Sequence, residues 1–109
     1  MDQTDKRRST RRNPIKAAFV CRPFTSSEPS RVADAVMHNY SNNGSYVKTS
    51  QAFNLGTILH LRLVSYLEKS TYMPTENQPR SICLAEVKWL QELADNETHR
   101  YGLGLKNLV

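Results

Sequence analysis

The chain has 109 residues, a mass of 12.5 kDa and a net charge of +5 at pH 7, with 39% hydrophobic and 23% charged residues. This length fits one domain and is too short for two hydrophobic cores. The apolar content is too high for a disordered chain, and no apolar run approaches the ~20 residues that a membrane-spanning helix needs. We therefore expect one folded domain without a membrane span.

The first 16 residues hold most of the positive charge. They contain six lysines or arginines and two aspartates, a net charge of +4, whereas the rest of the chain carries nine basic and eight acidic residues, a net charge of +1. This opening is polar and leads into no apolar segment of the kind that secretory signals have, so we expect a cytoplasmic protein. We interpret residues 1–14 as a flexible basic arm and residues 15–109 as the folded domain.

Four of the six basic residues in this opening segment are arginines. A guanidinium group donates paired hydrogen bonds to phosphate and stacks on flat rings, and an ammonium group does neither as well. The arginines therefore indicate that the arm binds a phosphorylated partner, and such a partner can also contain aromatic rings. The alternative that charge alone allows is a solvated tail that keeps the chain soluble or touches nucleic acid loosely.

Alternation of apolar and polar residues predicts six strands. The first two form a hairpin across a turn rich in Ser, Glu and Pro, and the polar residues 69–80 form an exposed connection. Gly102 and Gly104 in the last strand indicate a close approach of another group to the backbone, or a bulge. The predicted strands are 15–24, 31–38, 46–49, 57–67, 81–89 and 101–105.

Six short strands separated by turns, with no long amphipathic helix, indicate an all-β fold, a six-stranded antiparallel barrel. Closure into a barrel removes the exposed edges of so small a sheet. The alternation places Trp89 inside with Val87, and we expect Trp89 and Tyr101 in the core. Cys21 and Cys83 are expected to be small core residues, unpaired in a reducing compartment.

A tight loop is predicted between the second and third strands, where residues 39–44 are rich in Asn and Gly, which tolerate left-handed backbone angles. The loop contains the pattern Asn-x-Ser-x-x-Gly at Asn39, Ser41 and Gly44. The pattern puts an amide, a hydroxyl and a glycine backbone together at the end of a strand. In a protein that binds nothing, the same residues would simply form a good turn.

The arm contains the spacing Arg-x-x-x-Arg twice, once as Arg7 with Arg11 and once as Arg8 with Arg12. Together with the loop pattern, it resembles the PilZ domain family, which binds the bacterial second messenger cyclic di-GMP through an Arg-x-x-x-Arg motif and an Asp/Asn-x-Ser-x-x-Gly motif. Later segments resemble that family's strand after the glycine, its next turn, its penultimate strand and its closing strand. These segments are 44–49, 55–57, 85–89 and 101–105.

The resemblance covers residues 7–109 and implies a PilZ-like split barrel that binds cyclic di-GMP. It implies that the arginines bind phosphates and guanines, that the Asn39 side-chain carbonyl accepts from guanine N–H groups, and that Ser41 bonds to a base or a phosphate. Gly44 lets the backbone approach a ring. The implied binding residues are Arg8, Arg12, Asn39, Ser41 and Gly44, with Arg7 and Arg11 as the alternative register.

These features together predict a receptor that is not an enzyme and needs no cofactor. No arrangement of residues in the sequence suggests catalysis or a metal site. The resemblance implies that the receptor relays the signal to a partner protein in motility, pilus or exopolysaccharide control. The alternative is a barrel of the same fold that serves as an adaptor or structural module, binding a protein or nucleic acid and not the dinucleotide. Of these partners, nucleic acid is not the one we expect.

Overall fold

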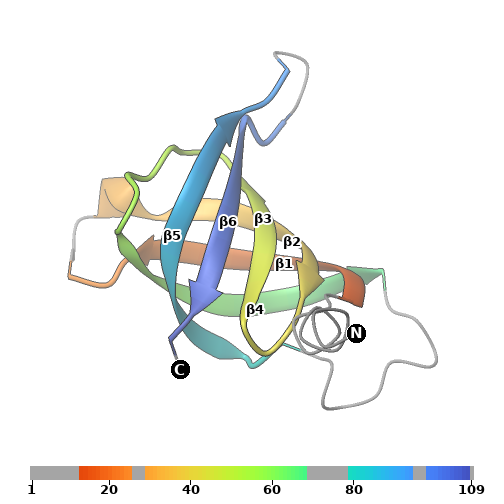
Figure 1. The fold of residues 1–109 in the computed structure, drawn as a ribbon. Coiled ribbons are helices and arrows are strands. Elements are labelled where there is room, and N and C mark those ends of the chain that lie inside the picture. Colours follow the sequence, from red (N-terminus) through yellow and green to blue (C-terminus); the bar gives the residue numbers. More distant parts are fainter. Residues whose placement is uncertain (1–12, 26–28, 69–78, 95–97, 109) are drawn as a thin grey trace, which may run out of the picture.

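The computed structural model describes residues 13–25, 29–68, 79–94 and 98–108 of the chain. Within these residues the regular structure is all strand apart from one turn of 3-10 helix, and no helix is long and apolar enough to cross a membrane. Figure 1 shows the arrangement. The elements are β1 (Asn13–Pro23), η1 (Pro29–Arg31), β2 (Ala33–Tyr40), β3 (Gly44–Thr49), β4 (Ile58–Glu68), β5 (Ile82–Glu92) and β6 (Tyr101–Asn107).

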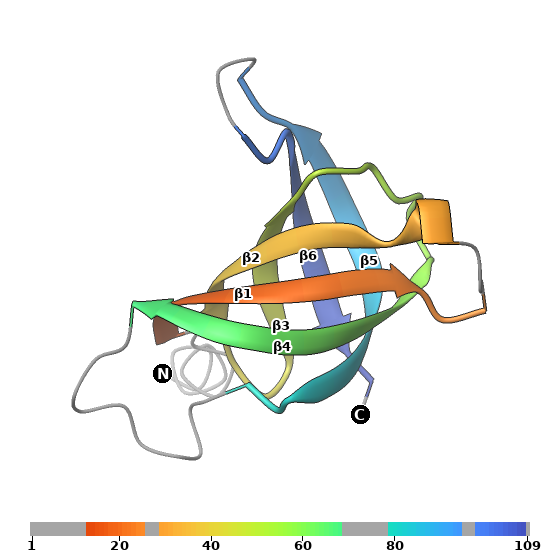
Figure 2. The ribbon, with the colours of Figure 1, turned by 180° about the vertical axis from the view of Figure 1, so that it is seen from behind.

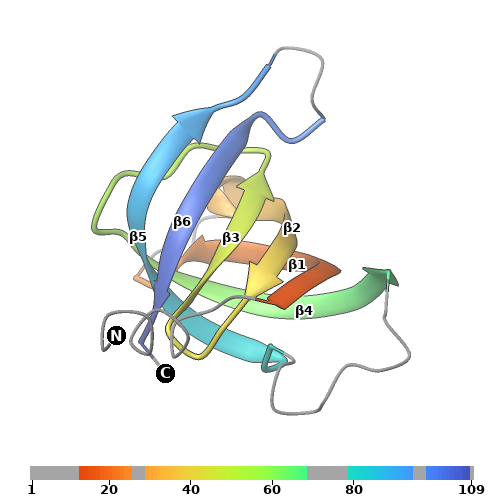
Figure 3. The same ribbon diagram turned by 45° about the vertical axis from the view of Figure 1, so that its right-hand side comes forward.

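The six strands form one closed barrel in the order β1-β2-β3-β6-β5-β4, and every neighbouring pair is antiparallel. In Figure 1, β5, β6 and β3 face the viewer, and the view from behind in Figure 2 brings β1 and β4 forward. Figure 3 shows the barrel from between these two sides. The prediction of an all-β, six-stranded antiparallel barrel is confirmed.

All six predicted strands are present, and their ends differ from the predicted ends by at most three residues. The predicted first hairpin is also confirmed, because β1 pairs with β2 and Phe19 lies opposite Ala35. Arg31 lies in η1 and not in the second strand. β5 continues to Glu92, three residues past its predicted end, because its last residues remain paired with β6.

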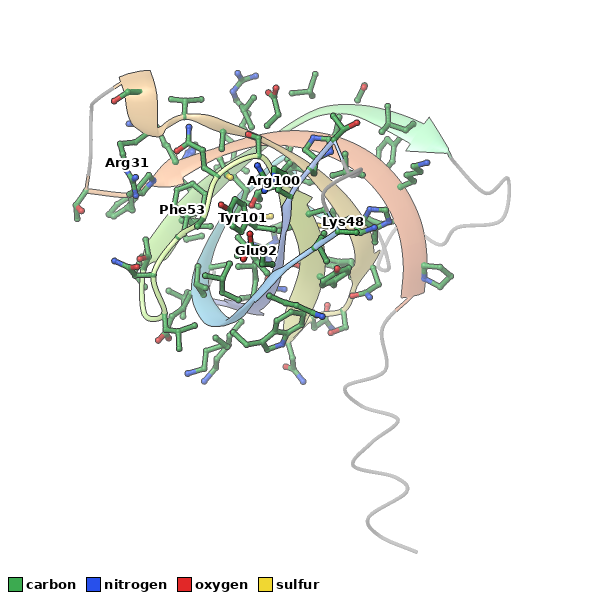
Figure 4. All side chains as sticks on the ribbon, turned by 90° about the horizontal axis from the view of Figure 1, so that it is seen from above. Arg31, Lys48, Phe53, Glu92, Arg100 and Tyr101 are labelled. Carbon is green, nitrogen blue, oxygen red and sulfur yellow. The ribbon has the colours of Figure 1, made fainter. Side chains whose placement is uncertain are left out.

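Alternate residues of the strands point into the barrel and form its hydrophobic core. Large side chains such as Phe19 and Leu61 are almost completely buried, and each contributes about 1.5–3 kcal/mol of burial free energy. Phe53, from the connection between β3 and β4, is 1% exposed, and the Arg31 guanidinium lies 5.4 Å from its ring centroid (Figure 4). The other core residues are Ile15, Ala17, Cys21, Ala33, Ala35, Met37, Tyr40, Val47, Leu59, Cys83, Ala85, Val87, Leu103 and Leu105.

The predicted core position of Trp89 is wrong. Inward alternation in β5 holds as far as Val87, but the register with β6 shifts between Val87 and Trp89. Such a bulge adds a residue to one strand and changes which face the following side chains occupy. Trp89 is therefore 43% exposed on the outside of the barrel, opposite Gly104. Tyr101, also expected in the core, is only half-buried.

Cys21 and Cys83 are buried and unpaired, as predicted. Burial raises the pKa of the Cys21 thiol to about 12, and the negative charge of Asp34 acts in the same direction. Burial also raises the pKa of the Cys83 thiol. Because the thiolate is the nucleophilic form, both side chains act as inert packing groups in the folded barrel.

We expect neither thiol to react with iodoacetamide at pH 8 while the barrel is folded, because pH 8 lies well below the raised pKa of Cys21. In denaturant both thiols should react readily, since an exposed cysteine has a pKa of about 8.5. Timed labelling followed by mass spectrometry measures the difference. Labelling of Cys21 in the folded protein as fast as in the denatured control would contradict its buried position.

Candidate functional site

The side chain of Ser41 shapes the loop between β2 and β3. Its Oγ accepts hydrogen bonds from the backbone N–H groups of Asn43 at 3.2 Å and Gly44 at 3.3 Å, and it donates to the Gly44 carbonyl oxygen at 3.3 Å. The backbone N–H of Ser41 donates to the same carbonyl at 2.8 Å. Ser41 is 6% exposed. The hydroxyl thus has a structural role that its predicted role as a ligand contact did not include.

The loop does not use the left-handed backbone angles that its composition suggested. Among the described residues no residue other than glycine has a positive φ, and Gly56, with φ of 88°, is the one glycine that does. Asn107 at the end of β6 holds the loop instead. Its Nδ2 donates to the carbonyl oxygens of Ser41 at 2.9 Å and Asn42 at 3.2 Å. Its backbone N–H donates to the Asn43 carbonyl at 2.8 Å.

Asn39 fixes the side of the loop that adjoins β3. The register of β2 with β3 shifts between Met37 and Asn39, which places Asn39 opposite Tyr46. The Asn39 Oδ1 accepts a hydrogen bond from the Tyr46 N–H at 3.1 Å. A carbonyl oxygen has two lone pairs, and this hydrogen bond to β3 occupies one of them. Asn39 therefore positions β3 whether or not it also touches a ligand.

Three aromatic rings lie in a row beside this loop on the outside of the barrel. The ring centroids of His38 and Tyr46 are 6.0 Å apart, and those of Tyr46 and Trp89 are 5.6 Å apart with an angle of 22° between the planes. Glycines in β6 make room for two of the rings. A Cβ atom at Gly104 would overlap the Trp89 ring, and one at Gly102 would lie 2.7 Å from the Tyr46 hydroxyl oxygen. The close approach predicted at these glycines is confirmed.

A hollow of about 490 Å³ opens between the loop and the Trp89 ring. Two lysines supply its positive charge, and one of them, Lys88, has its Nζ 3.7 Å from Glu86 Oε2 with 51% of its side chain exposed. The hollow thus offers ammonium groups, an aromatic face and amide groups within one space. Its lining residues are Ser41, Asn43, Lys88, Trp89, Gly104, Leu105, Lys106 and Asn107.

The arm joins the barrel beside this loop. Asn13, the first residue of β1, lies opposite Tyr40, and Pro14 lies opposite Asn39. The residue before Asn13 is therefore attached next to the start of the loop. The predicted arginines themselves lie outside the described residues; these are Arg7, Arg8, Arg11 and Arg12.

The loop motif was found from the sequence, but most of the hollow was not. The alternation predicts Trp89 in the core, because the bulge in β5 leaves no mark in the sequence pattern. Lys106 reaches the loop because β6 pairs with β3, which places it opposite Gly44. The one available signal was the Gly-x-Gly pattern of β6, because glycines on the outer face of a strand leave room for large rings from its neighbours.

No protein-family model matches the chain, and no curated protein matches it. The chemistry of the hollow must therefore be inferred from its own residues.

Replacing Gly104 by alanine should push the Trp89 ring away from β6, because the added Cβ would occupy its place. The exposed ring can swing outward, so we expect little loss of stability. Trp89 is the one tryptophan of the chain, so its emission maximum and the near-UV circular dichroism of the stack with Tyr46 report the movement directly. Emission and circular dichroism identical to wild type would contradict this packing.

Gly56→Ala is the matched control for this experiment. An added Cβ at Gly56 meets nothing within 4 Å, but its φ of 88° is unfavourable for alanine. We expect a loss of about 1–2 kcal/mol in the free energy of unfolding. The tryptophan emission of the folded control should not change.

Proposed function

We propose that this chain is a PilZ-type receptor that binds cyclic di-GMP and is not an enzyme. The ligand carries two anionic phosphates and two flat guanines. It needs cationic hydrogen-bond donors for the phosphates, and polar groups with stacking surfaces for the bases. The arm supplies arginines, and the loop with its adjoining hollow supplies the other kinds of group.

The pairing of β1 with β2 is the observation that carries the proposal. It sets Pro14 opposite Asn39, the first residue of the loop motif. Arg12 is bonded directly to Asn13, and Arg8 lies four residues earlier. Four residues of extended chain span at most about 14 Å, so both guanidinium groups are tethered within a short reach of the loop.

The hollow beside the loop supports the proposal with groups that suit a nucleotide. Trp89 is 43% exposed and offers a stacking face, and stacking of a base on such a ring contributes about 1–3 kcal/mol. Lys88 and Lys106 line the same hollow as that ring, and the Lys88 Nζ lies 3.7 Å from Glu86 Oε2. Micromolar affinity requires a binding free energy of about 8 kcal/mol. Two arginine–phosphate bonds at roughly 1.5–3 kcal/mol each, together with two stacked bases, approach this value.

The same arrangement suggests how binding reaches a partner protein. Contacts between the arm and the ligand would fix the arm against the outer face formed by β2, β3 and β6. The surface that this side of the barrel offers to another protein would then differ between the free and the bound state. The resemblance to the family implies that the partner acts in motility, pilus assembly or exopolysaccharide synthesis.

Titration calorimetry with cyclic di-GMP on the full chain tests the proposal. We expect micromolar binding that weakens at least about tenfold in Arg8→Ala and in Arg12→Ala, because each removes charge-assisted hydrogen bonds. Trp89→Ala should weaken binding by a similar factor. Arg62→Ala, which removes an exposed arginine from β4 across the barrel, is the matched control and should bind like wild type. No heat of binding in the wild-type protein would exclude this function.

Further measurements distinguish the two arginine registers and the alternative functions. Loss of binding in Arg7→Ala and Arg11→Ala, with Arg8→Ala unaffected, would move the motif to the alternative register. Ser41→Ala is a poor test, because its hydroxyl also shapes the loop. Binding of nucleic acid with a steep salt dependence, and none of cyclic di-GMP, would identify a nucleic-acid module. An adaptor for a protein would bind neither.

Hydrogen exchange gives a second, independent measurement on the arm. If its arginines contact the ligand, the backbone amides of residues 6–13 should gain protection when cyclic di-GMP is added. Exchange in this segment that is unchanged at saturating ligand would show that the arm takes no part in binding.

A further inference from the structure

β5 loses one of its two neighbours before the strand ends. Its residues 82–86 pair with β4, and the next residue, Val87, exchanges backbone hydrogen bonds with residues 56 and 57. All the residues of Lys88–Glu92 are exposed, and within the described part of the chain only β6 pairs with them. Figure 2 shows this end of the β5–β6 pair rising above the other strands. Over these residues β5 therefore has one paired edge and one open edge.

The backbone N–H and C=O groups of Leu90 face the open edge. Antiparallel strands exchange hydrogen bonds through every second residue pair. The Leu93 N–H donates to the Arg100 carbonyl oxygen at 2.7 Å, which is a bond toward β6. By the same alternation Gln91 bonds toward β6, and Leu90 faces away from it. Among the described residues no backbone group bonds to Leu90 on that side. An edge of this kind is a template for pairing with another strand.

The side chains beside Leu90 leave this edge uncovered. The Trp89 ring lies over Gly104 of β6. The Glu92 Oε2 lies 3.9 Å from the Arg100 guanidinium, and Figure 4 labels both residues. Both side chains therefore lean toward β6 and away from the open edge. A strand that approaches from that side meets the backbone directly.

We propose that two copies of this chain pair through the open edges of β5, as antiparallel strands about a two-fold axis at Leu90. The Leu90 N–H of each copy then donates to the Leu90 carbonyl oxygen of the other. The two Leu90 side chains, each 39% exposed, lie directly opposite one another. The two β5–β6 ribbons become one continuous sheet. A two-stranded ribbon is only marginally stable alone, and further strands stabilise it.

The residues around Leu90 complement one another across this axis. Lys88 of one copy lies opposite Glu92 of the other, and the two-fold axis repeats this pair of opposite charges. Within its own chain each has an exposed partner, Glu86 at 3.7 Å from Lys88 and Arg100 at 3.9 Å from Glu92. Exposed ion pairs contribute about 1 kcal/mol or less, so the new pairs fix the register more than they raise the affinity.

The neighbouring registers lack this complementarity. Pairing about Gln91 would set Leu90 opposite Glu92 of the other copy. It would also set Lys88 opposite Ala94, so no opposite charges would meet. Pairing about Glu92 would set two carboxylates opposite each other, which destabilises a strand pair. A second copy of the edge therefore matches best when Leu90 lies on the axis.

This contact goes beyond the proposed receptor function and does not depend on it, because it uses neither the arm nor the loop motif. Lys88 and Trp89 also line the hollow beside the loop, so the dimer is tested without cyclic di-GMP. A chain that stays monomeric and binds cyclic di-GMP would reject the dimer and retain the receptor. A chain that dimerises and binds no cyclic di-GMP would do the reverse.

Amide hydrogen exchange of the full chain at low and at high protein concentration tests the contact. Exchange at Leu90 should slow as the concentration rises, because its N–H becomes bonded to the second copy. Gln91 is the internal control, since its N–H bonds toward β6 in the monomer as well, and its exchange should change little. Sedimentation equilibrium on the same samples gives the dissociation constant. A monomer at every concentration would overturn the proposal.

Charge reversal tests the register. Lys88→Glu and Glu92→Lys should each raise the dissociation constant of the dimer about tenfold, because like charges then meet at both ends. The double variant should restore the wild-type constant. Within one chain the two residues are about 13 Å apart along the strand, so restoration requires pairing between copies. Arg62→Glu, an equal change of charge on β4, is the matched control, and weakening as large as in Lys88→Glu would contradict the register.

Leu90→Pro tests the backbone contact. Proline removes the N–H that faces the open edge and no hydrogen bond toward β6, so the dimer should be lost while the barrel remains. A dimer that survives in the folded variant uses another face and would overturn the proposal. If this variant does not fold, the wild-type exchange and the charge reversals decide. Slowed exchange at Leu90 on adding an extended peptide to a chain that stays monomeric would assign the edge to a different partner and reject the dimer.

Discussion

The pairing of β3 with β6 is the contact on which the rest of this molecule depends. It closes the barrel, because β6 and β3 are neighbours in space but are separated in the chain by β4 and β5. It also sets Gly44 opposite Lys106 and Tyr46 opposite Gly104. The hydrogen bonds from Asn107 to the loop, the room for the aromatic rings and the hollow beside them all follow from this one register.

The parts of the fold that the sequence predicted well are those where alternation runs without interruption. In β1 and β2, and in β4 as far as Leu61, every second side chain is buried, so side chains such as Phe19, Met37 and Leu61 mark that face clearly. The loop motif could also be found, since Asn39, Ser41 and Gly44 keep a fixed spacing. The purpose of these residues could not, because the bonds that Ser41 and Asn39 make within the loop and to β3 depend on the folded backbone.

The parts that could not be predicted trace to shifts in strand register. The β1–β2, β2–β3 and β5–β6 ladders each contain one, and the β1–β4 ladder contains two. A bulge is a property of two paired strands, so the residues of one strand alone do not reveal it. Two of these shifts act on the aromatic row, one by placing Asn39 opposite Tyr46 and one by turning Trp89 outward. Register shifts therefore decide which side chains form the aromatic row on the outer face, whereas regular alternation decides which side chains lie in the core.

The hydrogen bonds from Asn107 to the loop can form only after β6 has been synthesised. A nascent chain leaving the ribosome releases β2, the loop and β3 well before β6 emerges. Until then the carbonyl groups of Ser41 and Asn42 lack the amide donor that holds them in the finished barrel. Contacts of such long sequence separation form late in folding. Any molecule that recognises the shaped loop will thus select completed barrels over unfinished ones and stabilise them by mass action.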